Sequence, residues 1–374
     1  MEVAARKEGH VDFGSLDFVE PFEQMLSDLT HQARLSGVGH LVTPYYFTKI
    51  LRMRLRVQRA AQTDTMCAIQ RPVFILGLPR TGSTILHELL SLHPVLRAPT
   101  FWESHYWPEG GWRDQLTQGL THAQLFAVDR LAPTFRRIHE LQTMGPHECV
   151  SIQGYAFRSM QFHAAYRLPD YNRWMTSGCD WRPAYQWHAR HLGLLQQDRQ
   201  RWVLKAPGHM LGLAALLETY PDALFIQTHR HPTAVIPSMA SLTRSLRGIT
   251  TNHHDPEEIG RDVNALWWKG IHNVMTMRKN DPALNDRFLD LNFAALMAEP
   301  LKCLSRIIEH TGLDQNLSEP YLNRAHQYIQ QRPQHRHGKH AYNVDQFGLS
   351  NQALCDQYAD YIQHFDLCSD STQD

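Results

Sequence analysis

A glycine-containing loop between a predicted strand and a predicted helix is the clearest chemical feature of the sequence. The run Pro72–Gly77 is short, apolar and rich in strand formers, and Ser83–Leu92 has the apolar spacing of a helix. The loop reads Gly-Leu-Pro-Arg-Thr-Gly-Ser-Thr over residues 77–84. Such an arrangement presents backbone N–H groups and the positive end of a helix dipole to one point, which suits a phosphate. An ordinary turn that happens to contain two glycines is the alternative.

The loop resembles the Walker A pattern of ATP-binding proteins but lacks its lysine. Ser83 occupies the lysine position, and the cation of the loop is Arg80. Without that lysine the loop is poorly suited to the β- and γ-phosphates of ATP with Mg²⁺. It is better suited to a single phosphate or to a phosphosulfate.

A second anion site is predicted at the end of another strand. Arg230 follows the strand Ala223–Thr228, and Ser238 lies eight residues further on, in a helix that starts at Pro232. Arginine can bind a phosphate through two parallel N–H groups, and serine adds a neutral donor. Taken alone, the pair would be interpreted as a surface arginine and a helical serine.

Together these motifs resemble the sulfotransferases that use 3′-phosphoadenosine 5′-phosphosulfate (PAPS). Residues 71–84 resemble the 5′-phosphosulfate loop of that family, and residues 86–94 resemble the helix that follows it. The spacing of Arg230 and Ser238 is similar to that of the family's 3′-phosphate site. The resemblance implies that PAPS, and its product PAP, bind at the following residues: Arg80, Thr81, Gly82, Ser83, Thr84, Arg230 and Ser238.

The resemblance extends less closely to two later segments, so that it covers residues 70–350. Residues 291–300, with a helix that ends at Gly312, resemble the strand and helix after the 3′-phosphate site. Residues 335–342 and 345–349 resemble the segment that closes over the nucleotide. This implies further 3′-phosphate contacts from three residues: Arg336, Gly338 and Lys339.

Sulfuryl transfer needs fixed cations for the charge that develops on the transferred oxygens, and it does not require a metal ion. Arg80 and Lys205 are the predicted cations. Lys205 ends the predicted strand Arg201–Lys205, and parallel sheets place their ligand sites at the carboxyl ends of their strands. It also begins a segment that resembles the family's Lys-x-Pro motif. A solvated lysine at a strand end is the alternative.

Three residues are candidates for the base that takes the acceptor proton. Glu103 lies among aromatic residues that would exclude water, and some sulfotransferases carry a glutamate at a matching position. His209 follows Lys205 by four residues. Glu148 lies in a segment that resembles a Pro-x-Glu segment of the family. The preferred order is Glu103, His209 and then Glu148.

The elements that must position these groups alternate between strands and helices. A further strand is predicted at 288–291. The alternation indicates an α/β fold, a parallel sheet between helices in a P-loop-like three-layer sandwich with large helical insertions. Residues 51–59 alternate like a strand but are interpreted as helix, because they are good helix formers. The first 15 residues are expected to be frayed.

The predicted organisation has three parts. Residues 1–65 form an N-terminal helical extension, and residues 351–374 form a C-terminal helix and tail. Residues 66–350 form the sulfotransferase domain, in which 111–200 is a helical lid that determines the acceptor. The acceptor is predicted to be a small molecule, a lipid or a glycan. The sequence decides neither its identity nor the oligomeric state.

Composition excludes several other classes of protein. The 37 Lys and Arg balance 37 Asp and Glu, so the chain lacks the basic surplus of proteins that bind nucleic acid or acidic membranes. Six scattered cysteines indicate free thiols, and no apolar run approaches the length of a membrane span. A cytoplasmic protein is therefore predicted. Several histidine pairs occur, but no cysteine or carboxylate completes a metal pattern, so no metal site is predicted.

Two other functions remain open from the sequence. The first is a P-loop small-molecule kinase, against which the missing Walker lysine argues. The second is a nucleotide-binding scaffold without catalysis, against which Lys205 and the three base candidates argue.

Overall fold

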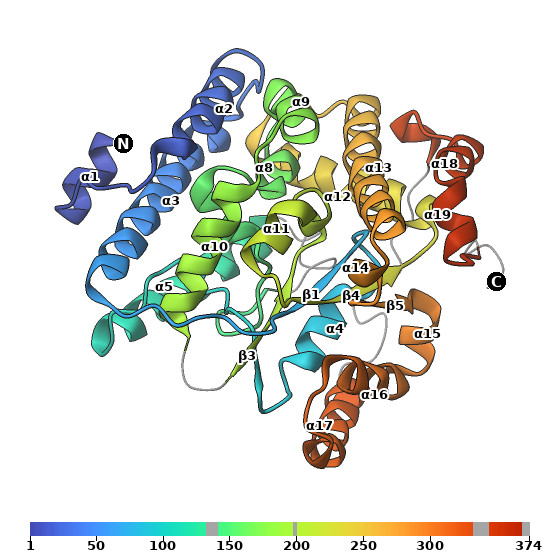
Figure 1. Cartoon of the computed structure of the whole chain (residues 1–374). Coiled ribbons are helices and arrows are strands. Elements are labelled where there is room, and N and C mark those ends of the chain that lie inside the picture. Colours follow the sequence, from blue (N-terminus) through green and yellow to red (C-terminus); the bar gives the residue numbers. More distant parts are fainter. Residues whose placement is uncertain (132–140, 197–199, 332–343, 369–374) are drawn as a thin grey trace.

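A five-stranded parallel sheet forms the centre of the computed structural model, which describes residues 1–131, 141–196, 200–331 and 344–368 (Figure 1). Its order is β2-β3-β1-β4-β5. The strands are β1 (Val73–Gly77), β2 (Leu96–Arg97), β3 (Arg201–Lys205), β4 (Leu224–His229) and β5 (Phe288–Asn292). Four of them agree with predicted strands. The two-residue β2 was not predicted, because so short a run carries no periodicity.

Alternation along the strands divides the core into two layers. Val73 and Ile75 point to one face of the sheet, and Phe74 and Leu76 point to the other. The first face packs against α4 (Ser83–Leu90), α16 (Pro300–Thr311) and α17 (Ser318–Gln331). The second packs against α10 (Arg182–Leu195), α11 (Leu213–Thr219), α12 (Pro232–Thr250) and α13 (Pro256–Asn280). Figure 1 shows the two helical layers below and above the sheet, which confirms the predicted three-layer α/β architecture.

The N-terminus is helical rather than frayed, so that expectation was wrong. The N-terminal helices are α1 (Glu2–Glu8), α2 (Val19–His31) and α3 (Gly37–Thr63). The Glu8 carboxylate accepts hydrogen bonds from Arg52 (2.5 Å) and Arg56 (2.8 Å) of α3, and Ala4 is buried. These ion pairs hold α1 in place. The continuous α3 confirms the helical interpretation of residues 51–59.

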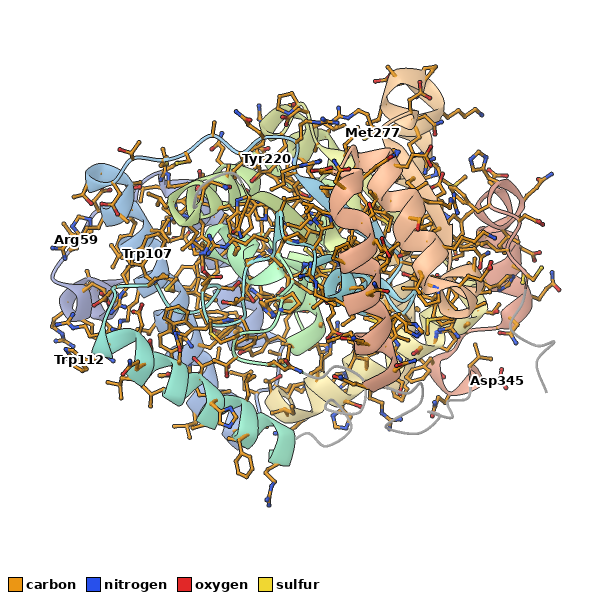
Figure 2. All side chains as sticks on the ribbon, turned by 90° about the horizontal axis from the view of Figure 1, so that it is seen from below. Arg59, Trp107, Trp112, Tyr220, Met277 and Asp345 are labelled. Atoms are coloured by element: carbon orange, nitrogen blue, oxygen red, sulfur yellow. The ribbon has the colours of Figure 1, made fainter. Side chains whose placement is uncertain are left out.

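The region from 111 to 200 is mostly helical, as predicted. Its described helices are α5 (Trp112–Leu131), α7 (Val150–Gln153), α8 (Met160–Ala165), α9 (Pro169–Ser177) and α10. Figure 2 shows α5 along the edge of the molecule, with Trp112 at its outer end. The other α-helices in the described part of the chain are α14 (Pro282–Asn285), α15 (Phe293–Ala298), α18 (Asn351–Gln357) and α19 (Ala359–His364).

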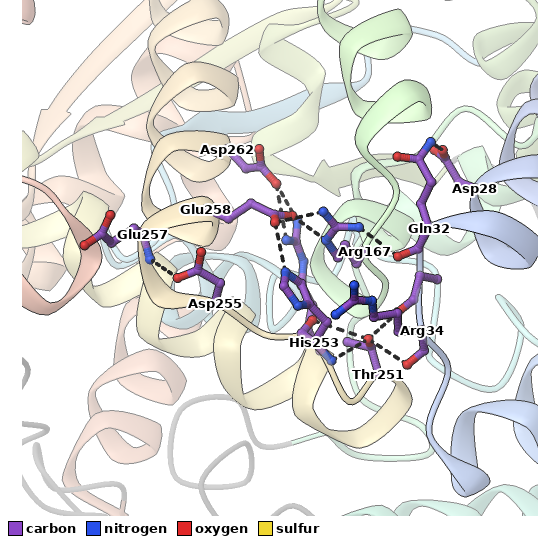
Figure 3. Close-up of polar contacts among 12 residues, drawn as sticks. Asp28, Gln32, Arg34, Arg167, Thr251, His253, Asp255, Glu257, Glu258 and Asp262 are labelled. Atoms are coloured by element: carbon purple, nitrogen blue, oxygen red, sulfur yellow. Dashed lines mark hydrogen bonds and ion pairs between the residues drawn. The ribbon is translucent and has the colours of Figure 1, made fainter.

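A polar network fastens the N-terminal helices to the rest of the chain (Figure 3). Arg167, just before α9, donates to both carboxylate oxygens of Glu258 on α13, at 2.7 and 3.0 Å. It also donates to the backbone carbonyl of Gln32, at the end of α2 (2.7 Å). The helices on either side of the predicted boundary near residue 65 also share one hydrophobic core. The N-terminal helices therefore pack against the helical layer that covers one face of the sheet.

All six cysteines are free thiols. Within the described residues, none of the helices combines the length and the apolarity that crossing a bilayer would need.

The close approach of β1 to β4 generates a stability prediction at Gly77. Its φ of 127° is unfavourable for other residues, and a Cβ atom there would lie 2.3 Å from the Thr228 carbonyl oxygen. Gly77→Ala should lower the free energy of unfolding by about 3 kcal/mol. Gly37→Ala is the control, because no heavy atom lies within 4 Å of its Cβ position. Urea unfolding curves measure the stability of both variants. A Gly77→Ala variant as stable as the Gly37→Ala control would contradict the expectation.

Buried histidines generate a prediction for acid stability. Burial lowers the pKa of five of them from 6.5 to about 3: His87, His105, His163, His191 and His209. The unfolded chain binds these protons near pH 6.5, whereas the folded chain resists them until about pH 3. Each histidine should therefore reduce the free energy of unfolding by about 1.4 kcal/mol per pH unit below pH 6.5.

Urea unfolding between pH 8 and pH 5 checks this expectation. His163→Leu should reduce the slope of the unfolding free energy against pH by about 1.4 kcal/mol per pH unit, because one fewer proton is bound on unfolding. An unfolding free energy that does not change between pH 7 and pH 5 would contradict it.

Candidate active site

A cavity of about 620 Å³ opens where the carboxyl ends of β1, β3 and β4 meet. Parallel pairing brings these ends to one edge, with Ile75 opposite Lys205 and Gly77 opposite Thr228. The wall combines the loop after β1, the end of β3, Arg230 after β4, and parts of α8, α12 and α15. Crevices at this edge are the usual ligand sites of parallel α/β sheets.

The loop after β1 has the backbone geometry of an anion site. Gly77, Arg80 and Gly82 all have positive φ, at 127°, 65° and 80°. Arg80 is the notable case, because a left-handed conformation disfavours a residue with a side chain. The loop leads directly into Ser83, the first residue of α4, where helix N–H groups lack partners within the helix. Gly82, Ser83 and Thr84 all line the cavity.

Thr81 has a different position from the other loop residues. Its side chain is fully buried and does not line the cavity. Its hydroxyl donates to the Leu78 carbonyl (2.6 Å) and contacts the Thr228 hydroxyl (2.6 Å). This hydroxyl therefore fixes the loop to β4, so the side chain of Thr81 does not face the predicted donor site.

Three predicted cations converge on the cavity: Arg80, Lys205 and Arg230 all line it. The Arg230 guanidinium donates to the Arg80 carbonyl (3.0 Å) and stacks on the Phe293 ring at 4.2 Å. These contacts hold the arginine beside the loop. The neutral net charge of the chain therefore conceals a locally basic cleft.

Lys205 forms an ion pair with Glu148 inside the cavity, in which the lysine is buried and the glutamate is partly exposed. The lysine side chain is only 3% exposed, and its Nζ atom contacts the Glu148 carboxylate and donates to the Thr84 hydroxyl (3.1 Å). A backbone hydrogen bond from Cys149 to the Lys205 carbonyl (2.9 Å) brings Glu148 to the end of β3. The pair thus links the phosphate loop to the segment before α7.

Glu103, the preferred base, does not line the cavity. Its carboxylate pairs with Arg97 of β2 (2.5 Å) and accepts from the backbone and the hydroxyl of Thr100 (2.9 and 3.0 Å). Partners on both oxygens give it a structural role in the turn after β2. The sequence predicted only aromatic neighbours for Glu103. The contact with Arg97 was missed because β2 was not predicted.

The other predicted residues are divided between the core, the helix surface and the undescribed part of the chain. His209 is fully buried, bonds the Tyr185 hydroxyl (2.9 Å) and does not line the cavity. Ser238 is partly exposed on α12 and is also not part of the wall, although its neighbour Met239 is. Arg336, Gly338 and Lys339 lie outside the described residues.

A chain of polar side chains in the wall was not predicted. His147 Nε2 contacts the Ser151 hydroxyl (2.8 Å), which lies 3.5 Å from His105 Nε2. The Phe101 carbonyl bonds His105 Nδ1 (2.9 Å), and burial lowers the pKa of His105 to about 3, so this ring is neutral. In the sequence, only the position of His147 beside Glu148 could have indicated this row of polar side chains. Glu88 also lines the cavity.

Apart from Gln161, the rest of the wall is apolar and comes mainly from α8, α12 and residues 141–150. Its aliphatic members are Ile85, Leu141, Val150, Met160, Ala164, Met239, Leu242, Leu246 and Met297. Methionine side chains adapt their shape to an irregular apolar ligand. One cavity therefore joins a cationic loop, suited to a phosphosulfate, to a wall suited to an apolar molecule.

Comparison with known proteins agrees with this arrangement. Residues 72–317 match the model of the sulfotransferase family. The omega-hydroxy-beta-dihydromenaquinone-9 sulfotransferase Stf3 of Mycobacterium bovis is 26% identical over 298 residues, which are 77% of this chain and 72% of that protein.

Two crystal structures are similar over nearly the whole chain. Sulfotransferase STF1 of Mycobacterium tuberculosis is 27% identical with a TM-score of 0.81, over 96% of this chain and 97% of that one. Sulfotransferase STF9 of Mycobacterium avium is 25% identical with a TM-score of 0.83, over 98% and 96%. These findings confirm the resemblance identified from the two phosphate motifs. The chain belongs to the sulfotransferase family.

Proposed function

We propose that this protein transfers the sulfuryl group of PAPS to a hydroxyl or amine of an apolar acceptor. The observation that carries the proposal is that the phosphate loop, three cations and an apolar wall line the same cavity. The loop and the apolar wall meet there at the Lys205–Glu148 pair. A sulfate donor is implied by the family, and PAPS is the donor that the two phosphate motifs suit.

The donor would be held at the carboxyl edge of the sheet. Gly82, Ser83 and Thr84 would bind the 5′-phosphosulfate through the start of α4, with Arg80 as the loop cation. Arg230 would bind the 3′-phosphate, with further contacts from Ser238, Arg336, Gly338 and Lys339. When bound, PAPS supplies the sulfuryl group, and these residues neutralise the negative charge that increases on PAP as it leaves.

We assign the base to Glu148 rather than Glu103, because Glu148 alone among the three candidates lines the cavity. In the transfer, the acceptor O–H proton goes to the Glu148 carboxylate as the acceptor oxygen forms a bond to sulfur. The bond between sulfur and the bridging oxygen of PAPS breaks, and that oxygen leaves with PAP. Lys205 lies between Thr84 and Glu148, where it can stabilise the transferred oxygens.

The apolar wall supports an acceptor with a large apolar part. Four of its residues belong to the predicted lid, residues 111–200: Leu141, Val150, Met160 and Ala164. A relative named for a menaquinone-derived acceptor agrees with a lipid alcohol. We further propose a cytoplasmic location, which the free thiols support.

Donor specificity is tested by calorimetric titration. PAP should bind, ATP with Mg²⁺ should not, and Arg230→Ala should weaken PAP binding by about 10- to 100-fold because it removes a charge-assisted contact. Arg244→Ala, at an exposed arginine of α12, is the control and should bind PAP normally. Binding of ATP with Mg²⁺ but not PAP would favour the kinase and exclude the proposed reaction.

The base is tested by paired glutamine substitutions, which keep an oxygen acceptor for each cation. Glu148→Gln should reduce kcat by at least about 100-fold and leave PAP affinity unchanged. Glu103→Gln should keep kcat near the original value and lower stability by about 1–2 kcal/mol, because it weakens the pair with Arg97.

Radiolabelled sulfate transfer to a series of long-chain alcohols measures kcat, and thermal unfolding measures stability. A large loss of kcat in Glu103→Gln alone would return the base to Glu103. Absence of transfer to any acceptor, with PAP bound normally, would favour the non-catalytic scaffold.

A further inference from the structure

The C-terminal helix α19 contacts the end of β4, directly before the arginine assigned to the 3′-phosphate. Tyr361 of α19 is only 1% exposed, and its hydroxyl lies 3.1 Å from His229 Nδ1. Phe365, in the turn after α19, stacks on the same imidazole, with 3.7 Å between the ring centroids. His229 is the last residue of β4, and Arg230 follows it directly.

The other nitrogen of the His229 ring is bonded to a carboxylate. Its Nε2 atom lies 2.8 Å from Asp290 of β5. Arg278 of α13 donates to both oxygens of that carboxylate, at 2.8 and 2.7 Å. Burial alone would raise the pKa of Asp290, but hydrogen bonds from Arg278 and His229 lower it below its ordinary value, so the carboxylate is ionised. Burial lowers the pKa of His229, so its ring is neutral at pH 7.

The ionised carboxylate and the neutral ring fix the direction of each hydrogen bond in this series. A carboxylate only accepts, so His229 carries its proton on Nε2 and donates to Asp290. Its Nδ1 atom therefore accepts, and the Tyr361 hydroxyl donates to it. The backbone N–H of Arg230 donates in turn to the Tyr361 oxygen. The series thus runs from the Arg278–Asp290 pair to the backbone of Arg230.

The side chain of Arg230 extends from this anchored backbone into the cavity. It lines the cavity, donates to the Arg80 carbonyl and stacks on the Phe293 ring. Because the side chain is long, a small rotation of the backbone at this residue displaces the guanidinium further than the Cα atom. Contacts with a bound ligand are sensitive to displacements of this kind.

The C-terminal helices are also anchored at a second place. The Trp268 indole of α13 donates to the Gln357 carbonyl at the end of α18 (3.2 Å). The Tyr358 hydroxyl donates to the side-chain oxygen of Asn264 on α13 (3.1 Å). Figure 1 shows α18 and α19, in red, beside α13. Loss of the Tyr361 hydroxyl alone should therefore leave α19 in place.

We propose that Tyr361 is a positioning residue of the donor site, and that α19 belongs to this site. Its hydroxyl holds the backbone at Arg230 so that the guanidinium meets the 3′-phosphate. The inference rests on the proposed function, which assigns the 3′-phosphate to Arg230. Tyr361 lies beyond residues 72–317, which match the family model, and within the segment predicted as a C-terminal helix and tail.

Calorimetric titration of Tyr361→Phe with PAP tests the inference. Phenylalanine keeps the buried ring and removes only the hydroxyl, so PAP affinity should fall about three- to tenfold, as expected for one lost hydrogen bond. In the transfer assay, the KM for PAPS should rise by the same factor while kcat stays near the original value, because Glu148 and Lys205 are unchanged.

Tyr358→Phe is the matched control. Tyr358 is buried like Tyr361, and its hydroxyl bonds α13 rather than the end of β4. Thermal unfolding should show similar losses of stability in the two variants, but Tyr358→Phe should bind PAP as the original chain does. In an Arg230→Ala background, Tyr361→Phe should weaken PAP binding no further, because the side chain that it positions is absent.

Unchanged PAP affinity in Tyr361→Phe would overturn the inference and leave the proposed function intact. Equal losses of affinity in Tyr361→Phe and Tyr358→Phe would also overturn it, because the cause would then be a general loosening of the C-terminal helices. So would a loss in Tyr361→Phe that adds fully to that of Arg230→Ala. Failure of the original chain to bind PAP would overturn the proposed function together with this inference.

Discussion

The parallel pairing of β1 with both β3 and β4 is the constraint on which the rest of the site depends. It brings three strand ends to one edge, so that residues as far apart in the sequence as Arg80 and Arg230 meet around one cavity. Each strand end supplies a different part of the chemistry. The loop after β1 has the backbone geometry of an anion site, Lys205 ends β3, and Arg230 follows β4. None of these residues could act together without that register, because their separations in the sequence exceed the reach of any side chain.

The Lys205–Glu148 pair shows how burial and function are linked in this cavity. The Lys205 charge is almost completely removed from water, and loss of Glu148 would leave it uncompensated. The low-dielectric surroundings of the buried lysine also strengthen its electrostatic attraction to a nearby anion. The site therefore has two unlike halves in contact, a charged loop and an aliphatic wall, and the ion pair stands at their boundary.

Glu103 and Glu148 illustrate what local sequence could and could not decide. Both lie near aromatic or histidine residues, and the sequence favoured Glu103. Its partner Arg97 lies on a strand of two residues, too short to show periodicity, and this contact keeps Glu103 out of the cavity. Glu148 reaches the cavity because a backbone bond fastens Cys149 to Lys205, 56 residues later. Non-local contacts of this kind have no signature in a single sequence.

The sequence by itself determined the family, the parallel α/β architecture, four of the five strands and the two phosphate motifs. These are encoded locally, through strand periodicity, the glycines that permit positive φ, and fixed spacings within one strand–loop–helix unit. Only the tertiary structure decided which candidate base lines the cavity, that Thr81 is structural, and that the N-terminus is ordered by Glu8. It also decided that α19 contacts the end of β4. Those outcomes depend on which distant surfaces pack together, and packing selects partners that no local pattern specifies.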